Sequence, residues 1–196
     1  MYSKCGKRII DFFISLIGLI VLSPIFFLLS LCIKLDTKGP ILFCQERTGK
    51  DNSSFYIYKF RTMRIDTPKD IPTHLLENPE QYITRMGKFL RKTSLDELPQ
   101  LLNIVKGDMA IVGPRPSLTN QYDLNELRDQ NGASSVRPGL TGLAQISGRD
   151  ELPIPIKADL DGQYVKRITF IGDLSLFFKT FTSVLKSEGI QEGKQE

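Results

Sequence analysis

The sequence predicts an α/β (α+β) protein that is mostly helical, contains a small β-hairpin or sheet, and begins with an apolar membrane segment. Three observations predict this class. A long uncharged run lies near the N-terminus, two short apolar segments flank a turn, and later segments repeat apolar residues at helical spacing. At 196 residues the chain is long enough for one compact domain with a small appendage.

Composition argues against several classes of function. The net charge of +4 is too small to indicate a nucleic-acid-binding protein. A lone histidine, His74, and three cysteines without CxxC spacing argue against zinc sites and a disulfide framework, and favour a reduced compartment. GxxxxGK[ST] and GxGxxG are both absent, which argues against a P-loop nucleotidase and a Rossmann dehydrogenase. Polar chemistry must therefore rest on carboxylates, arginine and lysine.

The first element is the apolar run at residues 12–33, which carries no charge and has basic residues on both flanks. As one straight helix it would rise about 33 Å, enough to cross a bilayer core. Ser23 and Pro24 interrupt it, and proline kinks a helix by removing a hydrogen bond. Basic residues mark the cytoplasmic side, and here they stand at both ends. The residues therefore allow either a kinked span or a re-entrant hairpin, with Asp11 capping the helix or pairing with Arg8.

The remaining chain alternates turns with short apolar runs. Residues 41–44 and 55–60 predict the two strands of a hairpin around a turn at 48–52. Apolar periodicity predicts helices over residues 80–92 and 98–106, and residues 122–130 are expected to form a polar surface helix. The second of these helices stops at Gly107.

The other segments are read from turn residues and from one more helical face. Loops are predicted at residues 66–79, 113–116 and 137–142, a short strand at 143–146, and a tail at 191–196. A last helix is expected behind Asp173 as its N-cap. Its apolar face comprises Leu174, Phe177, Phe178, Phe181 and Leu185.

Adjacent carboxylates, Asp96 and Glu97, lie in the densest polar cluster of the chain. Ser94 to Glu97 fits a capping box, whereas Pro99 suits a helix that begins there, and the sequence does not choose between them. Either start places both carboxylates near the positive end of a helix dipole. The simplest interpretation is that they cap the helix.

A second interpretation is a site for a phosphate or diphosphate. Arg91 and Arg115 flank the dyad, and guanidinium groups bind phosphoryl oxygens bidentately. Lys59 and Arg61, at the end of a predicted strand, are candidates to join them. Carboxylates beside a phosphate either hold Mg²⁺ or attack phosphorus to form an aspartyl phosphate.

Several ordered blocks resemble the bacterial sugar transferase family, the small monotopic phosphoglycosyl transferases. The blocks are Lys59-Phe60-Arg61-Thr62-Met63, residues 92–101, Lys106-Gly107-Asp108-Met109, Gly113-Pro114-Arg115-Pro116 and residues 137–145. The resemblance covers nearly the whole chain, with Ala110 and Gly172-Asp173 as small departures. It implies a re-entrant membrane hairpin over residues 1–38, a cytosolic catalytic domain over 39–196, and amphipathic helices at the bilayer surface. Residues 173–186 would form one of these helices or pack on the protein core.

The resemblance implies transfer of a sugar 1-phosphate from a UDP-sugar to undecaprenyl (polyprenyl) phosphate, with release of UMP, at the first membrane step of glycoconjugate assembly. Asp96 would be the nucleophile that holds the phosphosugar covalently, and Glu97 would complete the dyad. One or both carboxylates would bind Mg²⁺. Arg91 and Arg115 match phosphate-binding positions. Further substrate-binding positions are Lys59, Arg61, Arg137, Thr141 and Gln145.

Two alternatives accompany this function. The lipid phosphate could attack the donor directly, with the dyad only holding Mg²⁺, or the chain could be a non-catalytic membrane scaffold for glycan assembly. The implied location is the bacterial inner (cytoplasmic) membrane, with the catalytic domain facing the cytosol. Downstream glycosyltransferases are candidate partners, and the oligomeric state is left open. The sugar is also open, with N-acetylhexosamines favoured over galactose and glucose; residues 66–79 and 149–163 are candidate determinants of that choice.

Overall fold

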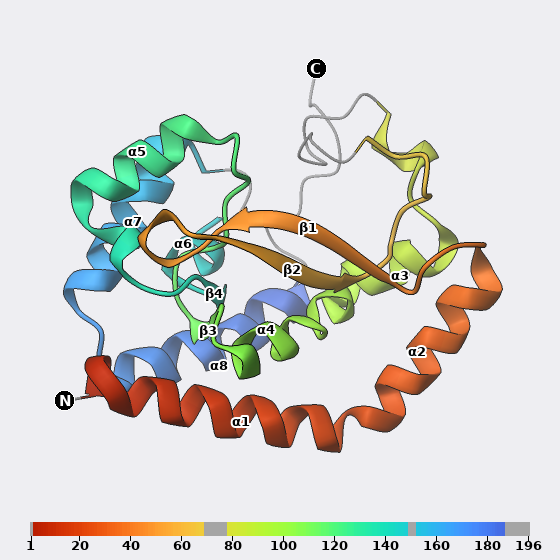
Figure 1. Ribbon diagram of the computed structural model, residues 1–196, viewed down its shortest axis with the longest axis horizontal. Coiled ribbons are helices and arrows are strands. Elements are labelled where there is room, and N and C mark those ends of the chain that lie inside the picture. Colours follow the sequence, from red (N-terminus) through yellow and green to blue (C-terminus); the bar gives the residue numbers. More distant parts are fainter. Residues whose placement is uncertain (1, 69–77, 149–151, 187–196) are drawn as a thin grey trace.

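The computed structural model describes residues 2–68, 78–148 and 152–186, and it is mostly helical, as the sequence predicts (Figure 1). The helices are α1 (Lys7–Val21), α2 (Ser23–Asp36), α3 (Arg85–Thr93), α4 (Gln100–Lys106), α5 (Tyr122–Asn131), α6 (Leu143–Ile146), α7 (Ile154–Lys166) and α8 (Phe170–Lys186). The strands are β1 (Leu42–Thr48), β2 (Ser54–Phe60), β3 (Ala110–Val112) and β4 (Gly139–Thr141). A π-helical turn, Tyr2–Gly6, precedes α1, and short 3₁₀ turns cover Lys50–Asn52, Pro79–Gln81, Leu95–Glu97 and Ala133–Ser135.

Helices α1 and α2 form a bent pair with its break at Ser23 and Pro24, where the sequence predicts one. The two axes differ by 62°, and the bend is visible at the lower edge of Figure 1. Pro24 lies in the first turn of α2, where its missing N–H costs no helical bond. The Ser23 hydroxyl donates to the Ile20 carbonyl at 2.8 Å. Within the described residues no single helix is long and apolar enough to cross a bilayer, but this pair is by length and composition.

The inner face of α1 packs on α4 and β3. Asp11 lies on this face, and its position differs from the predicted helix cap or pairing with Arg8. That residue is buried inside the helix rather than capping its start. Its carboxylate lies 3.8 Å from Lys7 Nζ and accepts the main-chain N–H of Ile111. Arg8 donates to the carbonyls of Ile104 and Val105. Neither predicted role of Asp11 is therefore correct, because α1 begins one turn earlier than its uncharged run.

Strands β1 and β2 confirm the predicted hairpin. They pair antiparallel from Leu42 opposite Phe60 to Thr48 opposite Ser54. Asn103 of α4 ties the hairpin to the rest of the fold, because its amide donates to the Tyr56 carbonyl at 2.7 Å and accepts from the Tyr58 N–H at 3.0 Å. The Asn103 side chain thus provides hydrogen-bond partners for main-chain groups of β2.

Strands β3 and β4 form a second, parallel pair that the sequence did not predict. The expectation for residues 137–142 and 143–146 is wrong in both halves: residues 139–141 form the strand, and residues 143–146 form α6. A four-residue apolar run does not distinguish a strand from a helix by periodicity. Strand β4 exists because Gly139 and Gly113 lack side chains and their backbones approach closely; a Cβ on either glycine would clash.

Helix boundaries follow capping residues. The predicted helix at 80–92 begins only at Arg85, because the Thr84 hydroxyl caps it by accepting from the Gly87 N–H at 2.9 Å. Helix α4 stops at Gly107 (φ 103°), as predicted. The predicted helix at 122–130 is α5.

Helix α4 begins at Gln100, directly after Pro99. The capping box is therefore wrong: Ser94 adopts a left-handed conformation (φ 55°), ends α3 and makes no side-chain cap. Of the two starts that the sequence allowed, the one at Pro99 is correct.

The C-terminal part contains two corrections. No secondary structure was predicted for the segment that forms helix α7; Pro153 and Pro155 stand at its N-terminal end, where proline is tolerated. Helix α8 begins at Phe170, so Asp173 lies in its first turn and is not the N-cap. Asp173 is instead buried. It accepts hydrogen bonds from Tyr2 at 2.6 Å, Lys7 at 2.5 Å and Tyr164 at 2.9 Å.

Two apolar clusters hold these elements together. One is centred on Ile57, Ile104, Met109, Val112, Tyr164 and Leu176, and joins β2, α4 and β3 to α7 and α8. The other is centred on Leu29, Ile33, Phe60 and Leu90, and joins α2 to β2 and α3. His74, the tail at 191–196 and most of the predicted loop at 66–79 lie outside the described residues, as do the side chains of Phe181 and Leu185.

Candidate active site

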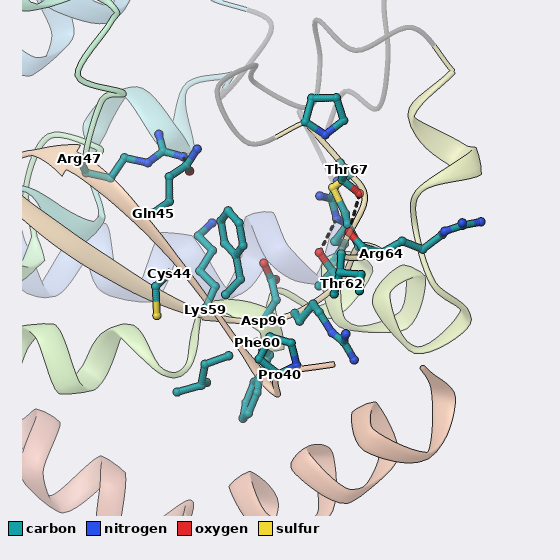
Figure 2. Close-up of a pocket in the computed structure, with 17 residues that line it drawn as sticks. Pro40, Cys44, Gln45, Arg47, Lys59, Phe60, Thr62, Arg64, Thr67 and Asp96 are labelled. Atoms are coloured by element: carbon teal, nitrogen blue, oxygen red, sulfur yellow. Dashed lines mark hydrogen bonds between the residues drawn. The ribbon is translucent and has the colours of Figure 1, made fainter. Parts of the chain in front are cut away.

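A cavity of about 370 Å³ lies beside the β1–β2 hairpin, and Asp96 lines it. Figure 2 shows Asp96 and Lys59 near its centre, Gln45 and Arg47 at one end, and Arg64 and Thr67 at the other. Strand β2 supplies Lys59, α3 supplies Arg91, and the chain leaving β2 supplies residues 61–65, 67 and 68. The sequence places these segments far apart, and the fold brings them around one carboxylate.

The position of Asp96 follows from the turn between α3 and α4. Ser94 reverses the chain in its left-handed conformation, and Leu95–Glu97 form a single 3₁₀ turn. Leu95 and Leu98 pack against the apolar cluster around Phe60 and Leu90. Because these leucines face the core, Asp96 between them faces the cavity, and Glu97 faces Lys59 and Arg115.

Burial dominates the electrostatics of Asp96. The pKa of its carboxyl group is raised to about 6, chiefly by loss of hydration and also by the neighbouring charge of Glu97. Lys59, Arg91 and Arg115 act in the opposite direction and favour the ionised form. The carboxylate is thus poorly solvated and faced by three cations. Poor solvation leaves an ionised carboxylate more reactive toward an electrophile than one in water.

Glu97 organises two of these cations. Its Oε1 accepts from Lys59 Nζ at 2.7 Å and from Arg115 at 3.1 Å. Lys59 and Glu97 are both largely buried, whereas Arg115 is more exposed. Charge-assisted hydrogen bonds of this kind are stronger than neutral ones. Glu97 therefore fixes Lys59 and Arg115 next to Asp96.

Arg91 is positioned by the contact between α3 and the chain that follows β2. Its Nε donates to the Thr62 hydroxyl at 3.0 Å. The Thr84 N–H donates to the Thr62 carbonyl at 3.0 Å, and a side chain on Gly87 would collide with that carbonyl. Glycine at position 87 is what allows α3 to approach so closely, and this approach brings Arg91 to the cavity wall.

Arg61 also lines the cavity, but its guanidinium group is bound to the chain. It is buried and donates to the carbonyls of Lys38 at 2.6 Å and Thr37 at 2.8 Å. Arg61 therefore connects the end of the bent helix pair to the wall of the cavity. This contact gives it a structural task beside the predicted role in substrate binding.

Three of the predicted substrate-binding residues lie elsewhere. Arg137 donates through Nε to the Gly107 carbonyl at 2.7 Å and lines a different cavity. Thr141 is buried, with its hydroxyl 2.6 Å from that of Thr180. Gln145 is buried and bonds weakly to the Leu140 carbonyl. The structure thus brings Lys59, Arg91 and Arg115 to the dyad, and leaves these three residues out of the cavity lining.

Strand β1 forms one wall of the cavity, and none of its residues was predicted from the sequence to belong to the site. Phe43, Gln45 and Arg47 all line the cavity. They occupy alternate positions of one strand, so their side chains share one face of the hairpin. The Arg47 guanidinium donates to the Gln45 side chain. Their spacing of two residues is the sequence signal that could have identified them as one face of a strand.

Asp96 and Glu97 supply only part of the ligand set that a divalent cation needs. Within the described residues no group of three or more His, Cys, Asp or Glu side chains could hold a metal ion. Mg²⁺ is commonly bound by one or two carboxylates, and water and substrate phosphates complete its shell. Asp96 and Glu97 fit that arrangement when a diphosphate is present.

Comparisons with known proteins identify a family. The bacterial sugar transferase family model matches residues 2–187. The chain is 39% identical to the uncharacterized sugar transferase EpsL of Bacillus subtilis, over 95% of this chain and 90% of the relative. It is 38% identical to the exopolysaccharide production protein ExoY of Sinorhizobium fredii, over 94% and 87%. It is also 35% identical to the undecaprenyl-phosphate galactose phosphotransferase of Salmonella typhimurium, over 95% of this chain but only 42% of that longer protein.

Proposed function

The chain belongs to the bacterial sugar transferase family, and we propose that it transfers a sugar 1-phosphate from a UDP-sugar to undecaprenyl or another polyprenyl phosphate. UMP is the second product. The observation that carries this proposal is the buried Asp96 carboxylate, which lines a cavity and is faced by Lys59, Arg91 and Arg115. A carboxylate that only capped a helix would need no such set of cations. The acceptor in the name of the Salmonella relative supports the same reaction class.

The proposed reaction has two displacements at phosphorus. In the first, an Asp96 oxygen forms a bond to the phosphorus that carries the sugar, and the bond from that phosphorus to the UMP oxygen breaks. In the second, an oxygen of the lipid phosphate attacks the same phosphorus and expels the Asp96 carboxylate. Donor and acceptor then use one small cavity in turn, and each step conserves charge and atoms.

Cations are required because a diphosphate repels an anionic nucleophile. Lys59, Arg91 and Arg115 would neutralise the phosphoryl oxygens before attack, and a preorganised positive charge is worth more in a poorly hydrated site than in water. Glu97 holds Lys59 and Arg115 in place for this task. When bound, Mg²⁺ supplies further neutralisation of charge on the diphosphate. Asp96 and Glu97 are the residues that would hold it.

The membrane placement belongs to the same proposal. Large apolar side chains are exposed on one helix after another: Ile17 and Ile20 on α1, Phe27 and Leu35 on α2, and Ile171 and Phe178 on α8. A surface this apolar is typical of contact with lipid. We place α1, α2 and α8 at the cytoplasmic membrane and the cavity on its cytosolic side, with the break at Ser23 and Pro24 turning a re-entrant hairpin. Such a site meets a water-soluble donor and a lipid-bound acceptor together.

The decisive experiment separates covalent from direct transfer. Purified wild-type protein with Mg²⁺ and a panel of UDP-sugars, without lipid, is expected to release UMP once per active site and to gain the mass of a phosphosugar. Asp96→Asn should do neither while remaining folded and membrane-bound. UMP release by Asp96→Asn at the wild-type rate would refute the nucleophile. Turnover that requires lipid and leaves no adduct would instead favour direct attack, with the dyad only holding Mg²⁺.

A further inference from the structure

A second cavity, of about 310 Å³, opens beside the N-terminal end of α1. It shares no lining residue with the cavity that contains Asp96. Four of its lining residues are cationic and one is a carboxylate. They are Lys7, Arg8, Lys50, Arg137 and Asp11.

Two buried carboxylates neutralise Lys7. Its Nζ lies 2.5 Å from Asp173 and 3.8 Å from Asp11. Arg8 and Arg137 differ, because each of them donates to main-chain carbonyls. Arg8 binds the carbonyls of Ile104 and Val105, and Arg137 binds that of Gly107. Across the part of the chain that the structure describes, neither guanidinium forms an ion pair with a carboxylate.

The two guanidinium groups therefore meet at the C-terminal end of α4. A helix end carries only about half a negative charge, so two full positive charges exceed it. Lys50, in the turn of the hairpin, adds a third; its ion pair with Asp51, at 3.5 Å, is exposed on both sides and weak. The cavity thus has a positive excess and room for a small anion.

The apolar surface beside the cavity indicates which kind of anion it binds. Ile9 and Phe13 are exposed on the first turns of α1, and Phe170 and Ile171 are exposed at the start of α8. The Tyr2 ring packs edge-on against Phe170, so the two apolar helix ends are adjacent. An apolar surface beside a cationic cavity is the arrangement that a phospholipid matches, with its chains on the one and its phosphate in the other.

We propose that this second cavity binds a phosphate group, carried by an anionic phospholipid or present as free phosphate. Arg137 and Arg8 would hold the phosphate oxygens through guanidinium N–H groups, and Lys50 would close the outer side. Bidentate recognition of phosphate is the geometry in which arginine exceeds lysine. The site requires no chemistry at Asp96, so it stands or falls independently of the proposed transferase reaction.

The test measures binding by the full chain in a neutral detergent. Short-chain phosphatidylglycerol, the matching phosphatidylcholine and inorganic phosphate are titrated at constant ionic strength, with the thermal midpoint as the readout. Phosphatidylglycerol is expected to stabilise the wild type more than phosphatidylcholine does. Removal of one cation near an anionic lipid costs about 1 kcal/mol, so Arg137→Gln should raise the apparent Kd about fivefold.

Controls keep the test decisive. Arg137 also holds the Gly107 carbonyl, so Lys50→Gln, at an exposed position, provides a second variant whose fold is secure. Lys166→Gln, exposed on α7 outside this cavity, makes the same charge change and should bind like the wild type. Stabilisation by inorganic phosphate that the variants weaken identifies free phosphate as a ligand, and stabilisation by phosphatidylglycerol alone identifies the lipid. Equal binding by Arg137→Gln, Lys50→Gln and Lys166→Gln, or no stabilisation by either anion, overturns the proposal.

Discussion

Replacement of Asp96 by asparagine is expected to stabilise the fold while it removes the proposed nucleophile. Burial raises the pKa of Asp96 from 3.8 to about 6, and each pKa unit corresponds to about 1.4 kcal/mol. Ionisation of this side chain in the folded state therefore opposes folding by about 3 kcal/mol at neutral pH. The penalty is absent below pH 3.8, grows as pH rises to about 6, and is constant above it. The asparagine side chain would carry no charge and no such penalty.

Thermal unfolding of the two proteins in the same detergent at pH 5, 6, 7 and 8 measures this effect. For a chain of this size, 1 kcal/mol shifts Tm by about 2–4 °C, so Asp96→Asn should unfold about 6–12 °C above the wild type at pH 8. The difference should shrink toward pH 5. Asp159→Asn, at an exposed position of α7, is the matched control and should show no pH-dependent gain. Equal Tm values for Asp96→Asn and wild type at pH 8 would refute the burial of a charged Asp96.

Two further predictions concern the pH profile and the support of the hairpin. If Asp96 must be ionised to attack, kcat/KM for UMP release should fall below pH 6 and reach about one tenth of its plateau near pH 5. A profile that is flat from pH 5 to 8 would contradict this role. Asn103→Ala should destabilise the protein by about 2–3 kcal/mol, because it removes hydrogen bonds to the main chain of Tyr56 and Tyr58. Chemical denaturation would measure that loss. Asn125→Ala, whose side chain bonds the side chains of Ser117 and Thr48, should cost less; an equal loss would mean that the hairpin does not depend on Asn103.

The locally encoded elements of the fold were predicted well. The hairpin followed from two apolar runs around a turn, and the end of α4 followed from Gly107. The break in the N-terminal pair followed from Ser23 and Pro24. In each case the cause lies within a few residues of the effect, because turn residues and proline act on their own backbone.

Elements that depend on distant partners were missed. Strand β4 exists because Gly139 lies against Gly113, and α7, which begins beside Pro153 and Pro155, was not predicted. Asp173 was expected to cap a helix, yet it is buried under Tyr2, Lys7 and Tyr164 from other parts of the chain. Local patterns carry no information about such contacts, which only packing supplies.

The sequence by itself identified the family to which the chain belongs and the candidate residues of the site, Asp96 and Glu97 with their candidate phosphate-binding neighbours. Only the tertiary structure decided which cations reach the dyad. Lys59, Arg91 and Arg115 face Asp96, whereas Arg137 stands at a second cavity beside α1. The physical reason is that charge acts over a few ångströms in space, and the distance between two charges is set by the packing of the segments that carry them.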